Sequence, residues 1–291
     1  MPTDDEKVAE GSRISNQMKT YTKPALAAVY GVVSESFGVL IGSGTFLRLC
    51  GKSYLLTAEH VVDEGKKYAT ITHTSSSGSK PVQFKHGFRL AKPPIDLALA
   101  RIDEDVVQEH GIVPWGVEAL GLSAGNIERD VMFVHGYPGE KSRWVPIVKG
   151  GIYSTSMPFW TSDCVSNWNQ FDEGKHLAIM YPKDGWFDET KKPIPMPLPF
   201  CMSGSAVWQT NRRDSTGAAW SSEQARIVGL VHLWNEPAES LIATRVEVIR
   251  DFLLDALRHE DAYALWEERG RPLWDDLRDW CEAERHIPEF W

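Results

Sequence analysis

The chain has 291 residues, which is enough for one large domain or two small ones with full cores. It carries 40 acidic and 31 basic residues, a net charge of −9, and the scattered Lys and Arg residues argue against nucleic acid or an anionic membrane as the partner. No apolar run approaches the roughly 20 residues of a membrane-spanning helix, and residues 1–6 are acidic where a secretory signal needs positive charge. We therefore expect a soluble, cytoplasmic protein.

The sequence changes character near residue 23. Residues 1–22 are polar and charge-rich, which predicts a flexible N-terminal arm. Beyond them, short runs of β-branched and aromatic residues alternate with glycines at a spacing of roughly 8–12 residues, which is typical of an all-β barrel or sandwich. The expected strands lie at 28–33, 38–41, 45–49, 54–57, 68–72, 82–84 and 97–102. They would close a first barrel near residue 105, followed by a connector through residue 128.

The second half repeats this pattern and then turns helical. Apolar runs predict strands at 131–139, 145–152 and 176–181, and the alternating prolines between 193 and 199 predict a stiff loop. Thr244 and Glu247 fit a capping box for a helix with apolar residues at helical spacing from Ile249 to Leu257.

A second helix is expected after Gly270 and Pro272. Its apolar stripe consists of Leu273, Trp274, Leu277, Trp280 and Cys281. The stripe is either core packing or a docking surface for a regulatory partner, since tryptophan is enriched at interfaces. The tail tryptophans are Trp266, Trp274, Trp280 and Trp291.

Three short motifs place a serine, a histidine and an aspartate in contexts that suit nucleophilic catalysis. Ser203 lies in Phe-Cys-Met-Ser-Gly-Ser, His60 in Thr-Ala-Glu-His, and Asp96 in Ile-Asp-Leu-Ala-Leu. A serine attacks an amide carbonyl at neutral pH only when a base takes its proton, and an imidazole does this best when a carboxylate fixes its tautomer. Each motif alone also fits a turn serine, a barrel histidine or a strand-end aspartate. Together they favour a triad of Ser203 as nucleophile, His60 as base and Asp96 as orienting group.

These motifs resemble the chymotrypsin-like (trypsin-like) serine proteases, most closely their bacterial intracellular and Htr-type branch. The Gly-Ser-Gly run at 42–44 and the apolar strands at 227–231 and 241–246 are also similar to the family, so the resemblance covers about residues 24–258. It implies an all-β fold of two six-stranded antiparallel barrels with C-terminal helices. The implied segments are a first barrel with connector at 23–128, a second barrel with its helix at 129–258, and a Trp-rich helical extension at 259–291.

The resemblance also implies an activity. It predicts a serine endopeptidase that cleaves protein or peptide substrates through an acyl-enzyme, with no metal and no organic cofactor. Secreted members staple the histidine loop with a disulfide, whereas here Val61 follows His60 and the four cysteines are widely spaced, which agrees with a reducing compartment. Two alternatives stay open: a protease-fold binding or scaffold protein with weak or silent catalysis, and an esterase with the same triad.

The segment at 200–205, which we call the nucleophile turn because it carries the candidate nucleophile Ser203, departs from the family's pattern at two positions. The resemblance assigns the oxyanion hole to the backbone amides of Cys201 and Ser203. The family has glycine at the position of Cys201, and a side chain there would restrict the peptide flip that forms the hole. Met202 replaces an aspartate that pairs with a freshly cut N-terminus in secreted members.

Three more residues are candidates for the substrate pocket. Pro197 corresponds to the pocket floor if the loops keep the family's length, and Trp234 replaces a wall glycine and would narrow the pocket. His232 replaces a serine near the triad aspartate, and it either donates a hydrogen bond to Asp96 or packs against its strand. With no acidic floor residue, Glu236 and Glu239 are the remaining candidates for recognising Arg or Lys.

Overall fold

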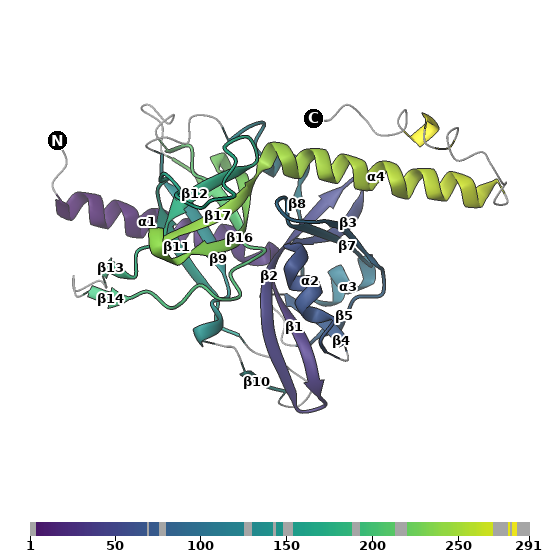
Figure 1. Cartoon of the computed structure of the whole chain (residues 1–291), viewed down its shortest axis with the longest axis horizontal. Helices are drawn as coiled ribbons and strands as arrows, with labels where there is room; N and C mark the ends of the chain where they lie inside the picture. Colours follow the sequence, from purple (N-terminus) through teal and green to yellow (C-terminus); the bar gives the residue numbers. More distant parts are fainter. Residues whose placement is uncertain are drawn as a thin grey trace.

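The computed structural model describes residues 4–68, 70–75, 80–124, 130–141, 144–147, 154–187, 193–212, 220–269, 279 and 281–283. Two curled, mainly antiparallel sheets form its body (Figure 1). The first sheet contains β1 (Leu26–Ser34), β2 (Phe37–Leu49), β3 (Lys52–Thr57), β4 (Thr70–Ser75), β5 (Val82–Gln83), β6 (Phe88–Ala91), β7 (Leu97–Ile102), β8 (Trp115–Gly116) and β10 (Trp144–Pro146). The second contains β9 (Met132–Gly136), β11 (Met157–Thr161), β12 (His176–Met180), β15 (Ala206–Gln209), β16 (Arg226–Asn235) and β17 (Ser240–Arg245). The described α-helices are α1 (Asp4–Thr22), α2 (Glu59–Gly65), α3 (Glu104–Glu109) and α4 (Val246–Glu268).

The first sheet runs in the order β5-β4-β1-β2-β3-β7-β6, with β8 and β10 added beside β2. Successive side chains of strand β3 point to opposite faces of this sheet, and each face meets a different apolar cluster. Leu55 packs inside the first sheet with Phe46 and Val61, whereas Tyr54 and Leu56 belong to the core shared with the second sheet. Strand β10 comes from the segment expected in the second barrel but pairs with β2, so the chain returns to the first sheet after entering the second.

The second sheet closes into a six-stranded barrel. Its order is β11-β9-β15-β16-β17-β12. The residues directly after β11 pair with β12: the Met180 N–H donates to the Ser162 carbonyl at 2.9 Å, and the Cys164 N–H donates to the Ala178 carbonyl at 3.0 Å. These bonds join the two ends of the sheet, which removes exposed strand edges.

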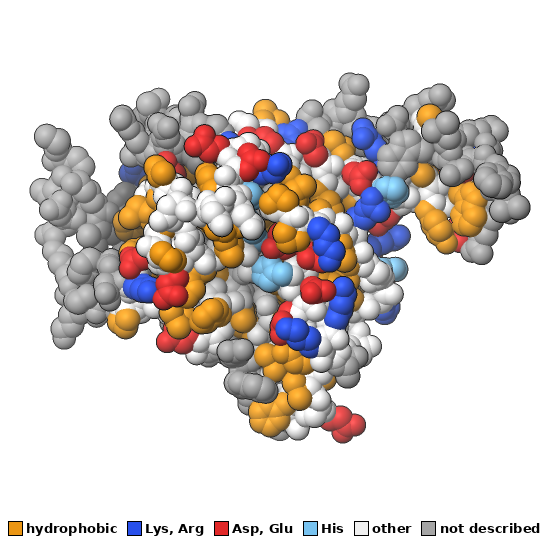
Figure 2. All heavy atoms as spheres, viewed as in Figure 1, with side chains coloured by type: hydrophobic (Ala, Val, Ile, Leu, Met, Phe, Trp, Pro, Cys, Tyr) orange, Lys and Arg blue, Asp and Glu red, His pale blue; other side chains and the backbone are white. Residues whose placement is uncertain are grey.

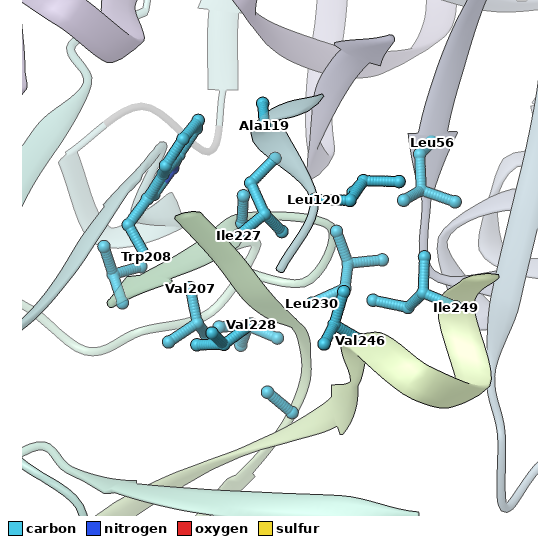
Figure 3. Close-up of a cluster of buried hydrophobic side chains, with 14 of the residues drawn as sticks. Leu56, Ala119, Leu120, Val207, Trp208, Ile227, Val228, Leu230, Val246 and Ile249 are labelled. Carbon is cyan, nitrogen blue, oxygen red and sulfur yellow. The ribbon is translucent and has the colours of Figure 1, made fainter. Parts of the chain in front are cut away.

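One continuous apolar core joins the two sheets (Figure 3). Leu56 of β3, Leu230 of β16 and Ile249 of α4 are buried in the same cluster, together with Leu120 from the connector. The predicted fold class is confirmed, because two curled antiparallel sheets with a C-terminal helix make up the mostly β, two-barrel architecture of the trypsin-like fold. The two sheets are therefore joined by close-packed elements.

The prolines before the nucleophile turn lie outside both sheets. β13 (Asp184–Phe187) and β14 (Pro193–Pro195) pair only with each other, as a separate two-stranded ribbon. Proline lacks the N–H that a central strand must donate.

The sequence predicts a flexible arm at the N-terminus. In the structure, residues Asp4–Thr22 instead form the helix α1. Ile14 and Met18 on this helix are 2% and 0% exposed, and they belong to the core of the second barrel. The half-buried ring of Tyr21 lies 4.4 Å from that of Trp115 between centroids. Ile14, Met18 and Tyr21 form an apolar stripe at helical spacing, but three residues among many charged ones give a weak signal in the sequence.

The C-terminal helix crosses from the second barrel to the first (Figure 1). Its predicted apolar face, which includes Ile249, Leu253 and Leu257, is buried. The boundary expected after residue 258 falls inside α4, where Glu260 accepts a hydrogen bond from the Tyr54 hydroxyl at 2.8 Å. The expected second helical stripe lies outside the described residues, apart from Cys281. None of the helices in the described ranges is long and apolar enough to span a bilayer.

The predicted capping box at the start of α4 does not form. Arg245 occupies the cap position and makes no side-chain cap hydrogen bond. The Thr244 hydroxyl instead donates to the Ile95 carbonyl at 2.6 Å, and the Glu247 carboxylate accepts the Ala124 N–H at 2.8 Å. Both side chains are drawn away from the helix end by partners that are distant in the sequence.

Acid should destabilise the fold through a histidine buried in the first sheet. His73 on β4 is 1% exposed, and neither ring nitrogen has a hydrogen-bond partner among the described residues. Burial, with a smaller contribution from the charge of His110, lowers the pKa of His73 from 6.5 to about 3. The unfolded state takes up a proton below pH 6.5 that the folded state resists, so stability falls as the pH drops from about 6.5 towards 3.

His73→Phe should remove this part of the pH dependence. Between pH 7 and pH 4, the free energy of unfolding of the wild type should fall by about 3 kcal/mol more than that of the variant. At pH 7 the variant should be at least as stable, because an apolar ring replaces an unpartnered polar one. Urea titrations at both pH values measure this, with the exposed His259→Gln as control. Equal losses in wild type and His73→Phe would contradict the prediction.

Candidate functional site

The structure brings His60 and Asp96 into direct contact at the edge of the first sheet. His60 is the second residue of α2, directly after β3, and Asp96 immediately precedes β7. The Asp96 carboxylate accepts two hydrogen bonds from His60, one from the backbone N–H at 2.9 Å and one at the ring Nδ1 at 2.7 Å. Asp96 has a φ of 55°, and this left-handed conformation turns its carboxylate onto α2.

The electrostatics of this pair suit an orienting carboxylate. Burial alone would raise the pKa of Asp96, but the hydrogen bonds and charge of His60 outweigh it and hold that pKa below its ordinary value. An ionised Asp96 that accepts at Nδ1 fixes the proton there, which leaves Nε2 as the basic nitrogen. The His60 side chain is 44% exposed, so part of its ring is accessible to solvent.

Ser203 lies on the turn directly before β15, and backbone hydrogen bonds hold this turn against both sheets. Its carbonyl accepts the Ser43 N–H of β2 at 2.8 Å, and the next N–H, of Gly204, donates to the Val231 carbonyl of β16 at 2.8 Å. A Cβ on Gly204 would touch the hydroxyl of Thr57, three residues before His60, so the turn lies beside the start of α2. The Ser203 Oγ donates to the His232 carbonyl at 3.4 Å and, within the described part of the chain, makes no hydrogen bond to His60. Catalytic hydrogen bonds are often long or absent before substrate binds.

The backbone around the nucleophile turn is held in a defined conformation. Cys201 has a φ of 68°, in the left-handed region that favours glycine. The Phe200 carbonyl accepts the Gly139 N–H at 2.5 Å, and in a trans peptide this points the Cys201 N–H away from Gly139. The Ser203 N–H has no hydrogen-bond partner among the described residues, which leaves it available to a ligand.

The thiol of Cys201 faces the first sheet. Its Sγ donates to the Leu40 carbonyl of β2 at 3.2 Å and packs beside Tyr137. Ser43 ties the same turn together, because its Oγ donates to the Cys201 carbonyl at 2.9 Å and accepts the Tyr137 N–H at 2.9 Å. The Gly-Ser-Gly motif of the sequence therefore supplies a side chain that fixes the nucleophile turn, a role the sequence does not reveal.

Gly204→Ala should disrupt this turn. Gly204 has a φ of 91°, and a Cβ there would overlap the carbonyl oxygen of Ser43. We expect a loss of about 3 kcal/mol in the free energy of unfolding, from the strained φ and from overpacking against backbone. Gly87→Ala is the matched control, since no atom lies within 4 Å of the added Cβ. Denaturant midpoints measure both variants, and two equal midpoints would show that the turn tolerates a side chain.

His232 lies near Asp96 but is too distant for a hydrogen bond, so of the two alternatives that the sequence leaves open the structure favours packing. Its Nδ1 is 3.7 Å from the Asp96 carboxylate, and its ring is 5.4 Å from that of His176 and 5.9 Å from that of Trp168 between centroids. Burial lowers the pKa of His232 to about 4, and the Asp96 charge only partly offsets this effect. His232 is therefore neutral at pH 7 and packs as an aromatic ring, while its carbonyl holds Ser203.

Two of the pocket candidates, Trp234 and Pro197, each contact an aromatic neighbour. The Trp234 ring meets that of Phe200 edge to face at 5.6 Å, and the Pro197 carbonyl accepts the Tyr181 hydroxyl at 2.6 Å. Lys183, which the sequence does not single out, binds both acidic candidates: its Nζ lies 2.8 Å from Glu236, and its backbone N–H donates to Glu239 at 3.4 Å. Both carboxylates thus already have a partner.

The surface around the site carries mixed charge. Figure 2 shows acidic, basic and hydrophobic side chains interspersed over this face, without a stripe of one sign. Among the residues that the structure describes, no group of three or more His, Cys, Asp or Glu side chains is placed to hold a metal ion.

Comparison with known proteins gives similarity at the level of fold. No known protein-family profile matches the chain, and no curated protein sequence is similar to it. Three similar solved structures are the serine protease domain of the Sesbania mosaic virus polyprotein (14% identity, 79% of this chain and 92% of that chain, TM-score 0.46), the VesB protease of Vibrio cholerae (11%, 82% and 64%, 0.49) and the MamO protease domain of Magnetospirillum magneticum (13%, 79% and 96%, 0.44). They do not distinguish one branch of the family from another, so the bacterial intracellular branch stays a prediction.

Proposed function

We propose that this chain is a cytoplasmic serine endopeptidase of the trypsin-like kind, which cleaves protein or peptide substrates with Ser203, His60 and Asp96. The observation that carries the proposal is the paired hydrogen bond from His60 to Asp96, at Nδ1 and at the backbone N–H, beside a serine on a left-handed turn. Such a pair orients an imidazole as a base and has little purpose in a histidine that only packs.

The proposed reaction follows from these positions. The Ser203 hydroxyl turns from the His232 carbonyl to Nε2 of His60, which takes its proton as Oγ bonds to the substrate carbonyl carbon. The N–H groups of Ser203 and Cys201 stabilise the oxyanion, and His60 returns the proton to the leaving amine. Water then attacks the acyl-enzyme by the same route and releases Ser203. Neither metal nor organic cofactor is needed.

We infer that the primary pocket takes uncharged side chains. Its wall is formed by Trp234 and Phe200, and the nearby Glu236 and Glu239 are both bound to Lys183. Glu236 forms an ion pair with Lys183 and Glu239 accepts the Lys183 backbone N–H, so a substrate Arg or Lys would have to compete for both carboxylates.

Digestion of a peptide library by the purified chain tests the activity and the preference together. Cleavage after apolar residues, absent with Ser203→Ala, is the expected result. Cleavage only after Arg or Lys would overturn the pocket assignment. Hydrolysis of esters with intact peptides would favour an esterase.

A second function is favoured by one observation, the absence of a Ser203–His60 hydrogen bond in the resting site. A protease-fold binding or scaffold protein with weak or silent catalysis would keep such a geometry when peptide is bound. A regulatory partner on the Trp-rich segment 259–291 fits either function. The tryptophans of that segment after residue 269 lie outside the described residues.

A further inference from the structure

The loop that presents Asp96 is held by two residues of the second barrel. The two peptide carbonyls directly before Asp96 each accept a side-chain hydrogen bond: that of Pro94 interacts with Nε2 of His176 at 2.9 Å, and that of Ile95 accepts the Thr244 hydroxyl at 2.6 Å. His176 and Thr244 lie directly opposite one another on the paired strands β12 and β17. One cross-strand pair therefore contacts two successive peptides of a loop that belongs to the other sheet.

The hydrogen-bonding direction at His176 is fixed by its own surroundings. Its Nδ1 accepts the Asp172 N–H at 3.1 Å, so the proton of the neutral ring lies on Nε2, which donates to the Pro94 carbonyl. The ring is 0% exposed and packs against Trp168 and His232, with centroids 5.3 and 5.4 Å away. His176 is thus an immobile donor.

The loop is also anchored in its own sheet, because Leu97, directly after Asp96, pairs with Ala91 of β6, and the Asp96 carboxylate accepts the His60 N–H of α2 at 2.9 Å. Within the loop, the Ile95 and Asp96 N–H groups donate to the Lys92 carbonyl at 3.1 and 3.3 Å, which closes a local turn but does not tie it to the rest of the molecule. His60, by contrast, is carried by α2 of the first sheet. The two carbonyls directly before Asp96 are thus held by the second barrel, whereas the histidine that its carboxylate binds belongs to the first.

We propose that His176 and Thr244 are positioning residues for Asp96, and that they make the His60–Asp96 hydrogen bond dependent on the packing of the two barrels. Neither side chain touches the proposed reacting atoms, so neither is catalytic. The inference rests on the proposed function for its consequence in catalysis, but the hydrogen bond itself can be measured without activity.

Thr244→Val and His176→Phe test the proposal, because each removes one donor and keeps most of the buried volume. The first readout is the NMR resonance of the His60 Nδ1 proton, which a short hydrogen bond to carboxylate shifts far downfield. We expect it to move upfield or broaden in both variants. In Thr244→Ser, which keeps the hydroxyl, the resonance should stay at its wild-type position. Ser240→Ala is the matched control, since this buried hydroxyl on β17 has no hydrogen-bond partner among the described residues.

The second readout is the pH profile of hydrolysis. A misaligned carboxylate stabilises the imidazolium less, so the acid limb of kcat/KM should move to lower pH. At the plateau, kcat should fall on the order of 10–100-fold with KM little changed. A merely structural role would lower the denaturant midpoint and leave the resonance and the acid limb unchanged, and that result would overturn the inference. If His176→Phe does not fold, Thr244→Val alone decides.

The two proposals fail in different ways. A wild-type chain without Ser203-dependent hydrolysis would overturn the proposed function, while the proton resonance still decides whether His176 and Thr244 position Asp96. Normal hydrolysis with an unchanged resonance in Thr244→Val and His176→Phe would overturn only the positioning role.

Discussion

Replacing Ser203 with alanine is expected to remove nearly all peptide hydrolysis, with a loss on the order of a millionfold in kcat, and His60→Ala should cost about as much. The serine supplies the atom that bonds to the substrate, and without the imidazole its proton has no acceptor. The two losses should not add, since both residues act in one step.

The matched control is Ser205→Ala, two residues further along the same turn. Ser205 is 0% exposed, and its hydroxyl has no hydrogen-bond partner among the described residues. Its removal should leave kcat within a few-fold of the wild type. Near-normal hydrolysis by Ser203→Ala, or equal losses from Ser203→Ala and Ser205→Ala, would remove Ser203 from the proposed role.

Asp96→Asn is expected to lower kcat by about 10⁴-fold while the protein stays folded. The carboxylate accepts two hydrogen bonds from His60, and an amide in its place can offer an N–H to Nδ1. The imidazole proton would then lie on Nε2, where a base is needed. Steady-state kinetics on peptide substrate measure the effect.

Asp63→Asn is the control for this change. Asp63 lies on the same helix as His60, but its side chain is 60% exposed and forms an ion pair with the exposed Lys66. Its replacement should leave kcat unchanged. Activity above a tenth of wild type in Asp96→Asn would mean that the His60 tautomer does not depend on Asp96.

The strands and the short motifs around His60, Asp96 and Ser203 can be predicted because their signals are local. Strand β3 lies between two cores, so both of its faces are apolar, and the sequence shows this as a short continuous apolar run at residues 54–56. His60, Asp96 and Ser203 each lie in a short motif, and the structure places the first two in contact. What the motifs cannot give is the conformation of the Ser203 hydroxyl, which depends on the His232 carbonyl 29 residues away.

The remaining features depend on tertiary contacts. Thr244 and Glu247 match a capping box in the sequence, but the Thr244 hydroxyl finds the Ile95 carbonyl 149 residues away. His176 acts through the Pro94 carbonyl, 82 residues away, and nothing in its local sequence marks it. Helix α1 was hidden for another reason: its few buried residues lie among charged ones, so composition predicted disorder where packing against the second barrel makes a helix.

The central claim is that Ser203 is an activated nucleophile, and labelling with a fluorophosphonate probe measures this directly. The probe phosphonylates only a serine whose proton is removed by a base, and mass analysis of the digested protein locates the adduct. We predict one rapid adduct on the peptide that contains Ser203, present in Ser205→Ala and lost in Ser203→Ala and His60→Ala. A folded wild-type chain that stays unlabelled at Ser203, or that labels at the same rate after His60→Ala, would contradict the account and favour a binding or scaffold function.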